Sequence, residues 1–253
     1  HNEINLIDGQ IVTNDRFERM EINKDLPLLK GFESCFSSQK TLEMMVQFSR
    51  CKDIPEETGS SDTIDAKLYP LLHGLDENNR RRTAPVVLIE NLRGNYTGGR
   101  WVFINQETSF KFWENGGYKL LMKLAQFCSK RCFDLLIKPN YAAYYPGQVL
   151  IINLQAQSFD FNRDLNLVLS IYRNNNICYK KKFSFKIDRN MFYKDIPLDF
   201  RVDKGLYLLK DEIKSKEEPV RIIHNGFWCY DRNLLNRGSE LKCNSNYFIR
   251  DEE

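Results

Sequence analysis

The sequence has few of the residues on which metal and acid–base chemistry depend. Its 253 residues include only three histidines, at positions 1, 73 and 224, and its seven scattered cysteines form no CxxC pair. A structural zinc ion is usually held by four closely spaced thiolate or imidazole ligands, so we expect neither a metal site nor a cofactor. Nothing supports a Ser-His-Asp triad either, and we expect a structural role for His224. Cys128 and Cys132 are expected to be packed free thiols.

Long apolar runs and an excess of one charge are also missing. No run approaches the ~20 apolar residues that cross a bilayer. The 37 basic and 34 acidic residues are interleaved and give a net charge of only +3, which argues against a nucleic-acid surface. With 42% apolar residues and a mean hydropathy of −0.51, the composition is typical of a soluble globular protein without a membrane span.

The sequence has no recognisable start signal. It begins HNEINLIDGQ, with neither an initiator methionine nor a basic region followed by an apolar one. The residues from 227 to 249 are rich in aromatic side chains. We expect them either to pack on the rest of the chain while presenting a surface to an absent domain, or to form a terminal strand and turn that completes this domain's own core. We therefore expect a processed or excised piece of a longer protein. At ~100–150 residues per domain, the length favours two domains.

The chain is organised around the stretch from Arg100 to Gly147, where the apolar period changes twice. The run from Trp101 to Ile104 predicts a strand. A helix is predicted next, with Asn115 as its N-cap. Its apolar face is expected to hold residues at spacings of three and four: Tyr118, Leu121, Leu124, Ala125 and Cys128. After Cys132 the period falls to two.

Before this stretch, one hairpin is predicted. The apolar runs Ala66 to Leu75 and Ala84 to Leu92 flank the polar residues 76–82, which suggests two strands joined by a charged tip. The run from Thr41 to Ser49 fits either a helix or a strand. The polar residues 51–62 are expected to form a loop.

From Tyr141 onward the sequence predicts an antiparallel β-sandwich. Apolar and polar residues alternate over 150–156, 165–171 and 179–187, and two further short strands are expected around 198–202 and 206–209. The asparagines at 174–176 favour a hairpin because asparagine readily adopts positive φ. Regular turns favour an immunoglobulin-like or fibronectin-like fold, although the Cys…Trp…Cys pattern is missing. The charged residues 210–218 are expected to form a solvated edge or linker.

The predicted fold class is α+β and rich in strands. An α+β portion at 1–138 is followed by a sandwich at 139–218 and by a structured tail or linker at 219–253. The division near Lys138 to Tyr141 rests on the change of hydrophobic period.

Four segments in order carry a resemblance to a known family: GGRWVFINQ, FWENGGYKLLMKLAQFC, LLIKPNYAAYYPGQ and GFWCYDRNLL…YFIRDEE. Together they resemble a region upstream of the TIM barrel in large multidomain bacterial glycoside hydrolases of the β-galactosidase type. The resemblance covers roughly Asp65 to Glu253. The part from Arg100 to Cys128 also looks like the end of a glutamine-amidotransferase-like domain, which implies a partial α/β portion, but no nucleophile-elbow Cys or Ser is present.

The resemblance implies a noncatalytic accessory or scaffold region that contacts a catalytic domain beyond Glu253, in a periplasmic or secreted protein. No catalytic residue is expected here, since no pair of carboxyls stands out from the surface charge. One alternative is a carbohydrate-binding module that uses the exposed rings of Trp113, Trp228, Tyr144 and Tyr145. An independent hydrolase is the other. The sugar, the compartment and the oligomeric state stay open.

Overall fold

The structure, a computed structural model, describes residues 17–36, 66–106, 108–160, 162–216 and 218–230. Strands dominate it, with two α-helices and two short 3₁₀ turns. In chain order the elements are β1 (Arg19–Ile22), η1 (Glu33–Cys35), β2 (Ala66–Leu75), β3 (Arg81–Asn91), η2 (Gly94–Tyr96), β4 (Arg100–Ile104), α1 (Phe110–Glu114), α2 (Gly117–Cys128), β5 (Phe133–Pro139), β6 (Ala143–Tyr144), β7 (Val149–Ser158), β8 (Arg163–Arg173), β9 (Asn176–Ile187), β10 (Phe192–Arg201), β11 (Gly205–Lys214) and β12 (Arg221–Cys229).

The amino-terminal portion is built on a four-stranded sheet in the order β1-β2-β3-β4. The predicted hairpin is confirmed: β2 and β3 pair antiparallel, and the Asp76 carboxylate caps the tip by accepting hydrogen bonds from the backbone of Asn78 and Arg80. All pairings of this sheet are antiparallel. The expected partial α/β portion is therefore wrong for the described residues, because an α/β portion is built on parallel strands joined by crossover connections, and none of these pairs is parallel.

Glycines, and not Asn115, start the main helix. Gly116 has φ 93° and is the N-cap of α2, whereas Asn115 ends α1 and donates its side-chain amide to the Ser34 carbonyl. A side chain at Gly117 would collide with the Phe112 ring, since an added Cβ would lie 2.3 Å from it. The tight α1–α2 corner therefore depends on two adjacent glycines.

The predicted helix is confirmed, but its buried face is rotated from the expected one. Leu120, Leu124 and Phe127 are buried against the sheet. Tyr118 and Leu121, which were expected on that face, are exposed. The shared spacing of three and four residues allowed both faces, and packing on the sheet selected the one with Leu120.

The sandwich consists of two antiparallel sheets, one with the order β10-β7-β5 and the other with the order β6-β12-β11-β8-β9, in which only the short β6 runs parallel to its neighbour. Its core is filled by the alternating apolar residues of both sheets, for example Leu150, Ile152 and Leu154 on β7. The predicted hairpin after β8 is confirmed, with Asn174 and Asn175 at φ 50° and 64°. The chain thus has a strand-rich fold with an immunoglobulin-like sandwich.

The sandwich extends beyond the boundaries expected from the sequence. β5 begins at Phe133 and pairs along its whole length with β7. β12, which had been placed in a tail, pairs with β11 and closes the larger sheet. Whether the two portions unfold as separate units stays a prediction. The expectations for 41–49, for the loop 51–62 and for the tail beyond Tyr230 lie outside the described residues.

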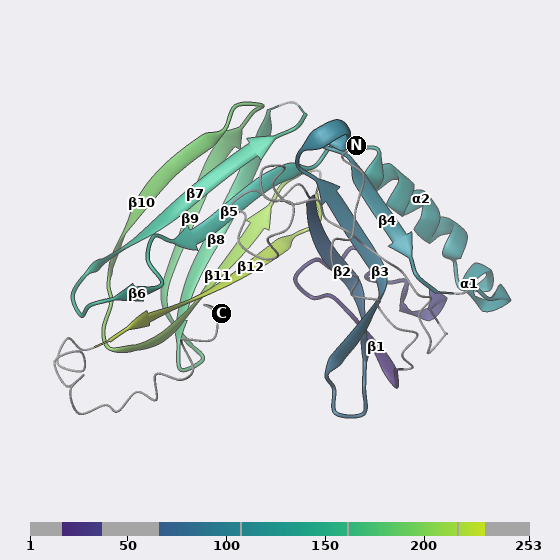
Figure 1. Cartoon of the computed structure of the whole chain (residues 1–253), viewed down its shortest axis with the longest axis horizontal. Coiled ribbons are helices and arrows are strands. Elements are labelled where there is room, and N and C mark those ends of the chain that lie inside the picture. The colour runs from purple at the N-terminus through teal and green to yellow at the C-terminus, as the bar shows by residue number, and fades with distance from the viewer. Residues whose placement is uncertain (1–16, 37–65, 107, 161, 217, 231–253) are drawn as a thin grey trace, which may run out of the picture.

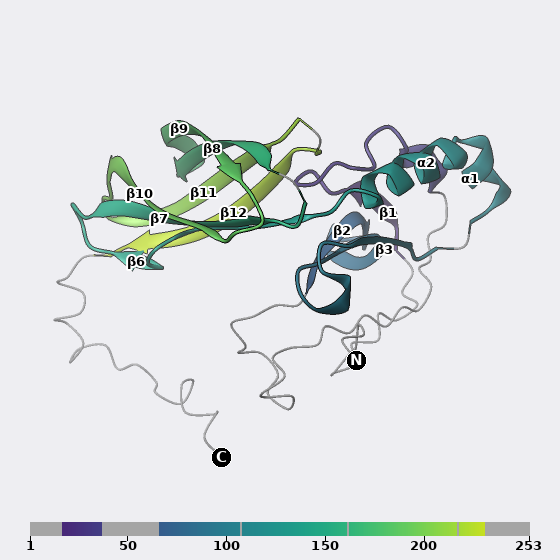
Figure 2. The same ribbon diagram turned by 90° about the horizontal axis from the view of Figure 1, so that it is seen from above.

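The two portions lie side by side along the longest axis of the molecule (Figures 1 and 2). The sandwich occupies one end, and α1 lies at the opposite end in both views. β5 leads from α2 into the sandwich, and the start of β12 lies near the amino-terminal sheet (Figure 1). Among the described residues, no helix is long and apolar enough to span a membrane.

The charged run 210–218 is not a solvated linker. Residues 210–214 continue β11, and Asp211 faces the sandwich core between Leu209 and Ile213. Its cross-strand neighbours are Leu169 and Ile223. The Asp211 side chain is fully buried, and neither carboxylate oxygen has a hydrogen-bond partner. Burial raises the pKa of this carboxyl to about 8, so it is largely protonated at neutral pH.

Asp211 is expected to make the stability of the fold decrease as pH rises from about 4 to about 8. Over this range the folded chain keeps the Asp211 proton while the unfolded chain releases it, which favours unfolding. Asp211→Asn should remove this dependence and raise the free energy of unfolding at pH 8 by about 2–4 kcal/mol. Denaturant titrations between pH 4 and 8 measure it, with the exposed Asp164→Asn as control. Equal pH slopes for wild type and Asp211→Asn would show that the carboxyl is not buried.

Candidate functional site

The most unusual group of side chains lies where the two portions meet, and it begins with Glu90. In β3, Val86, Leu88 and Glu90 point to the same face of the sheet, so strand periodicity places a carboxylate in line with core residues. Arg100 is directly opposite Glu90 on β4. Its Nε donates to Glu90 Oε1 at 2.8 Å, and both side chains are fully buried.

Arg221, the first residue of β12, binds the same carboxylate from the sandwich. Its two terminal nitrogens donate to the two oxygens of Glu90, each at 2.6 Å. This planar, two-bond geometry is the strongest arrangement open to an arginine and a carboxylate. It joins residues 131 positions apart in the chain. Glu90 is thereby the point at which the amino-terminal sheet is bound to the sandwich.

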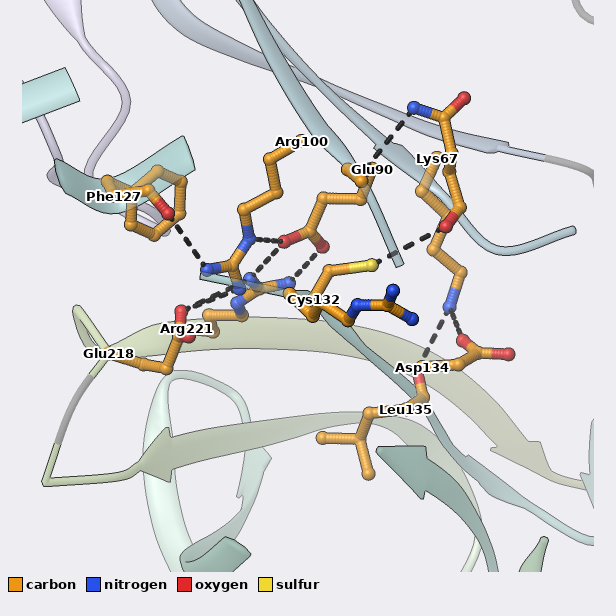
Figure 3. Close-up of polar contacts among 12 residues, drawn as sticks. Lys67, Glu90, Arg100, Phe127, Cys132, Asp134, Leu135, Glu218 and Arg221 are labelled. Atoms are coloured by element: carbon orange, nitrogen blue, oxygen red, sulfur yellow. Dashed lines mark hydrogen bonds and ion pairs between the residues drawn. The ribbon is translucent and has the colours of Figure 1, made fainter. Parts of the chain in front are cut away.

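A second carboxylate extends the ion pairs. Glu218, just before β12, accepts from Arg100 Nη2 at 2.8 Å and from Arg163 Nη1 at 2.7 Å. Arg100 Nη1 also donates to the Phe127 carbonyl in the last turn of α2. Figure 3 shows the Arg100, Glu90, Arg221 and Glu218 side chains converging between the two portions. We call the set Glu90, Arg100, Arg163, Glu218 and Arg221 the junction cluster.

Aromatic rings enclose the arginines of the junction cluster. The guanidinium carbon of Arg100 lies 4.2 Å from the centre of the Phe127 ring. That of Arg221 lies 4.7 Å from the Phe133 ring and 5.5 Å from the Tyr69 ring. A cation over an aromatic face is attracted to it, and more strongly where water is excluded. The rings therefore keep water out and hold the guanidinium planes in place.

The cluster stays ionised despite its burial. Burial raises the pKa of the Glu90 carboxyl, but Arg221 and Arg100 outweigh this effect and hold that pKa below its ordinary value. Burial lowers the pKa of the Arg221 guanidinium, whereas Glu90 and Glu218 raise it, with an upward net result. Each charge is therefore stable only while its partners are in place.

Two neighbouring groups do not add reactive chemistry. Cys132 is fully buried, its thiol contacts the Asn91 carbonyl at 3.6 Å, and burial raises its pKa to about 12, so it is not a thiolate nucleophile. Lys67 and Asp134 form a second, partly exposed ion pair across the junction at 2.6 Å. As expected for packed free thiols, Cys128 and Cys132 form no disulfide.

A small cavity of about 60 Å³ adjoins the cluster and is lined by Arg221, Tyr69 and Phe133 among others. Arg221 Nε has no protein partner. The space is large enough for a few water molecules and too small for a sugar ring or a peptide. In the described ranges, no group of three or more His, Cys, Asp or Glu side chains could hold a metal ion. The geometry of the cluster suits binding two parts of the chain together.

The four aromatic residues proposed for carbohydrate binding do not form one site. Tyr144 is 1% exposed, lies in the sandwich core and donates its hydroxyl to Asn140, so its ring cannot stack on a sugar. Trp113 is half exposed but belongs to α1, at the far end of the molecule. Trp228, which is 59% exposed, and Tyr145 lie at the same end of the larger sheet. Of the four, these two are the pair that combines proximity with rings that are not fully buried. His224 contacts Asp25 at 3.0 Å, as fits a structural role.

The sequence reading missed the junction cluster. The sequence contained a signal for it. Glu90 directly follows the apolar residues VVLI, and Arg100 and Arg221 each stand directly before an apolar run. A charge at a core-facing strand position needs a partner. Arg100 lies only 10 residues from Glu90, but the second partner, Arg221, lies 131 residues away, and Glu218 was hidden among the charges of 210–218.

Comparison with known proteins identifies no family. No family model matches the chain, and no curated protein is significantly similar to it. Solved structures show distant similarity to immunoglobulin-like β-sandwich domains. Among them are the CARDB domain of a Pyrococcus furiosus protein (8% identity, TM-score 0.31, 39% of this chain and 88% of that one), a red sea bream transglutaminase (9%, 0.28, 62% and 26%) and a Listeria innocua β-glucosidase (11%, 0.26, 40% and 16%).

The match thus spans about a quarter or less of the transglutaminase and the β-glucosidase. At these identities and scores the similarity is a distant likeness to immunoglobulin-like sandwich domains and nothing finer. No activity or ligand follows from it for this chain.

Breaking the junction cluster is expected to destabilise the fold far more than breaking the exposed pair beside it. Glu90→Gln leaves two buried guanidinium groups short of a counter-charge, which should lower the free energy of unfolding by about 3–5 kcal/mol. The control Asp134→Asn removes one partner of the partly exposed Lys67 pair and should cost at most about 1 kcal/mol. Denaturant titration at pH 7 compares them. Equal losses for both variants would mean that the cluster is hydrated and weak.

Proposed function

We propose that this chain is a noncatalytic scaffold whose amino-terminal portion and sandwich are held in one fixed orientation. The observation that carries the proposal is the junction cluster. Across it, Glu90 of the amino-terminal portion pairs with Arg221, and Arg100 of the same portion pairs with Glu218, which also binds Arg163. Buried ion pairs add little net stability but demand one geometry. A single fixed geometry is the property that a scaffold needs if it is to set the position of the next domain.

The proposal includes a larger protein of the bacterial glycoside hydrolase type, in which the scaffold contacts and positions a catalytic domain beyond Glu253. Its support is the sequence resemblance of the four segments between Gly98 and Glu253. In keeping with it, two of those segments form β4 and α2, and a third runs from β5 to the turn before β7. The sandwich is then an accessory region, and its partner is intramolecular.

The alternative of an independent hydrolase has less support. A glycosidase needs two carboxyls about 5–10 Å apart that flank a sugar bond in an open cleft. Asp211 and Glu90 have the opposite pKa shifts that such a pair requires, but both are fully buried, Glu90 is committed to two arginines, and Asp211 faces only apolar neighbours. Neither can reach a substrate.

The purified chain is accordingly expected to hydrolyse no glycoside by itself. A panel of aryl α- and β-glycosides tests this, at several pH values between 4 and 8. Turnover that follows the pure protein through separation, and that disappears when one of its own carboxylates is replaced, would overturn the noncatalytic assignment.

Carbohydrate binding is the second candidate, and the exposure of the Trp228 ring near Tyr145 favours it. Aromatic faces of this kind can stack on sugars. Titration with soluble polysaccharides decides it: Trp228→Ala should weaken binding at least tenfold while Trp113→Ala leaves it unchanged. Equal affinities of both variants and the wild type, or no binding at all, would remove this candidate.

A further inference from the structure

The outer face of the larger sandwich sheet carries a band of apolar side chains across four of its strands. Register places Ile177 of β9 opposite Tyr172 of β8, and Tyr172 opposite Leu208 of β11. Leu206, the next outward residue of β11, lies opposite Trp228 of β12. Residues that face each other across strands point to the same side of a sheet, so these five form one surface. We call it the apolar band.

The apolar band is open to solvent and hollowed. Trp228, Leu206 and Leu208 are 59%, 51% and 44% exposed. Gly226, opposite Leu208, has no side chain, and an open groove of about 630 Å³ runs past it beside Tyr172. Isolated exposed apolar residues are ordinary, but a contiguous apolar patch usually marks a surface that another segment covers.

Two lysines, Lys180 and Lys210, border the apolar band on one side, and the His224 ring in the same row contacts the Asp25 carboxylate. The outward residues of the next row are Lys180, Ser170, Lys210 and His224, on four adjacent strands. A segment that fits this face should therefore offer apolar side chains followed by carboxylates.

We propose that residues 231–253 of this chain dock on the apolar band. They follow directly from Tyr230, whose ring lies 5.0 Å from that of Tyr145 at the β12 end of the band. Their sequence has the required order, because Tyr247, Phe248 and Ile249 come shortly before Asp251, Glu252 and Glu253.

The length of the segment is sufficient. The band crosses four strands, or about 15 Å at ~4.8 Å per spacing. Twenty-three residues can extend over ~75 Å, so Phe248 can reach any point on the band. A segment tethered at Tyr230 also has a high effective concentration, which favours it over a free partner of the same chemistry. The scaffold function does not depend on this docking. The junction cluster includes Arg221, at the start of β12, whereas the apolar band includes Trp228, near the end of the same strand.

The test uses Trp228 as the reporter. In the full chain, Trp101→Phe and Trp113→Phe leave Trp228 as the single tryptophan, and acrylamide quenching measures its access to solvent. Replacing Phe248 and Ile249 by Asp in that background should increase the quenching constant at least twofold and shift the emission to longer wavelength. Leu208→Lys, which changes the apolar band itself, should increase the quenching constant of Trp228 in the same way.

Leu136→Lys is the matched control, because Leu136 is a half-exposed leucine on β5, in the smaller sheet. It should leave the quenching constant unchanged. A chain ending at Tyr230 provides a second measurement and should give the same high access as the Asp double variant. Equal quenching in all folded variants would overturn the proposal. Protection of Trp228 that grows with protein concentration would also overturn it, since it would assign the band to a second copy of the chain.

Discussion

The architecture depends on one electrostatic constraint, which is that the Glu90 carboxylate has no access to water. A carboxylate in that position is tolerated only with counter-charges in hydrogen-bond contact. Arg100, opposite it on β4, supplies one from the same sheet, and Arg221 supplies the other from the sandwich. Because Arg221 must approach in the plane of the carboxylate, the start of β12 is fixed relative to β3. The relative placement of the two portions follows from this contact.

The burial of Glu90 also explains why the junction cluster is poorly suited to bind a substrate. Glu218 completes the set by neutralising Arg100 and Arg163, and the Phe127 and Phe133 rings cover the guanidinium groups. Each of the three arginines of the cluster donates to at least one of its two carboxylates, so the charges orient the chain and have little capacity left for a substrate. A scaffold role accounts for such an arrangement better than catalysis does.

The sequence predicted the elements well where periodicity was clear and failed where tertiary contacts decided. The alternation over 150–187 led directly to β7, β8 and β9, and the asparagines at 174 and 175 to their hairpin. The spacing of α2 fitted two faces, and only packing on the sheet distinguished them. The charged run 210–218 was misread, because local composition cannot show that Asp211 points into a core or that Glu218 meets Arg100 from 118 positions earlier. Exposure of an aromatic ring was equally unpredictable: Tyr144 and Tyr145 are neighbours, and only the first is buried.

The central claim is that the junction cluster fixes one orientation of the two portions. A distance measured between spin labels on α2 and β9 tests it most directly, with ketone-bearing residues at Lys119 and Lys182 so that the native cysteines stay unlabelled. Both positions are exposed and lie in different portions. The account predicts a single narrow distance distribution for the wild type, which broadens when Glu218→Gln removes the charge shared by Arg100 and Arg163. A broad distribution in the otherwise native chain would contradict it.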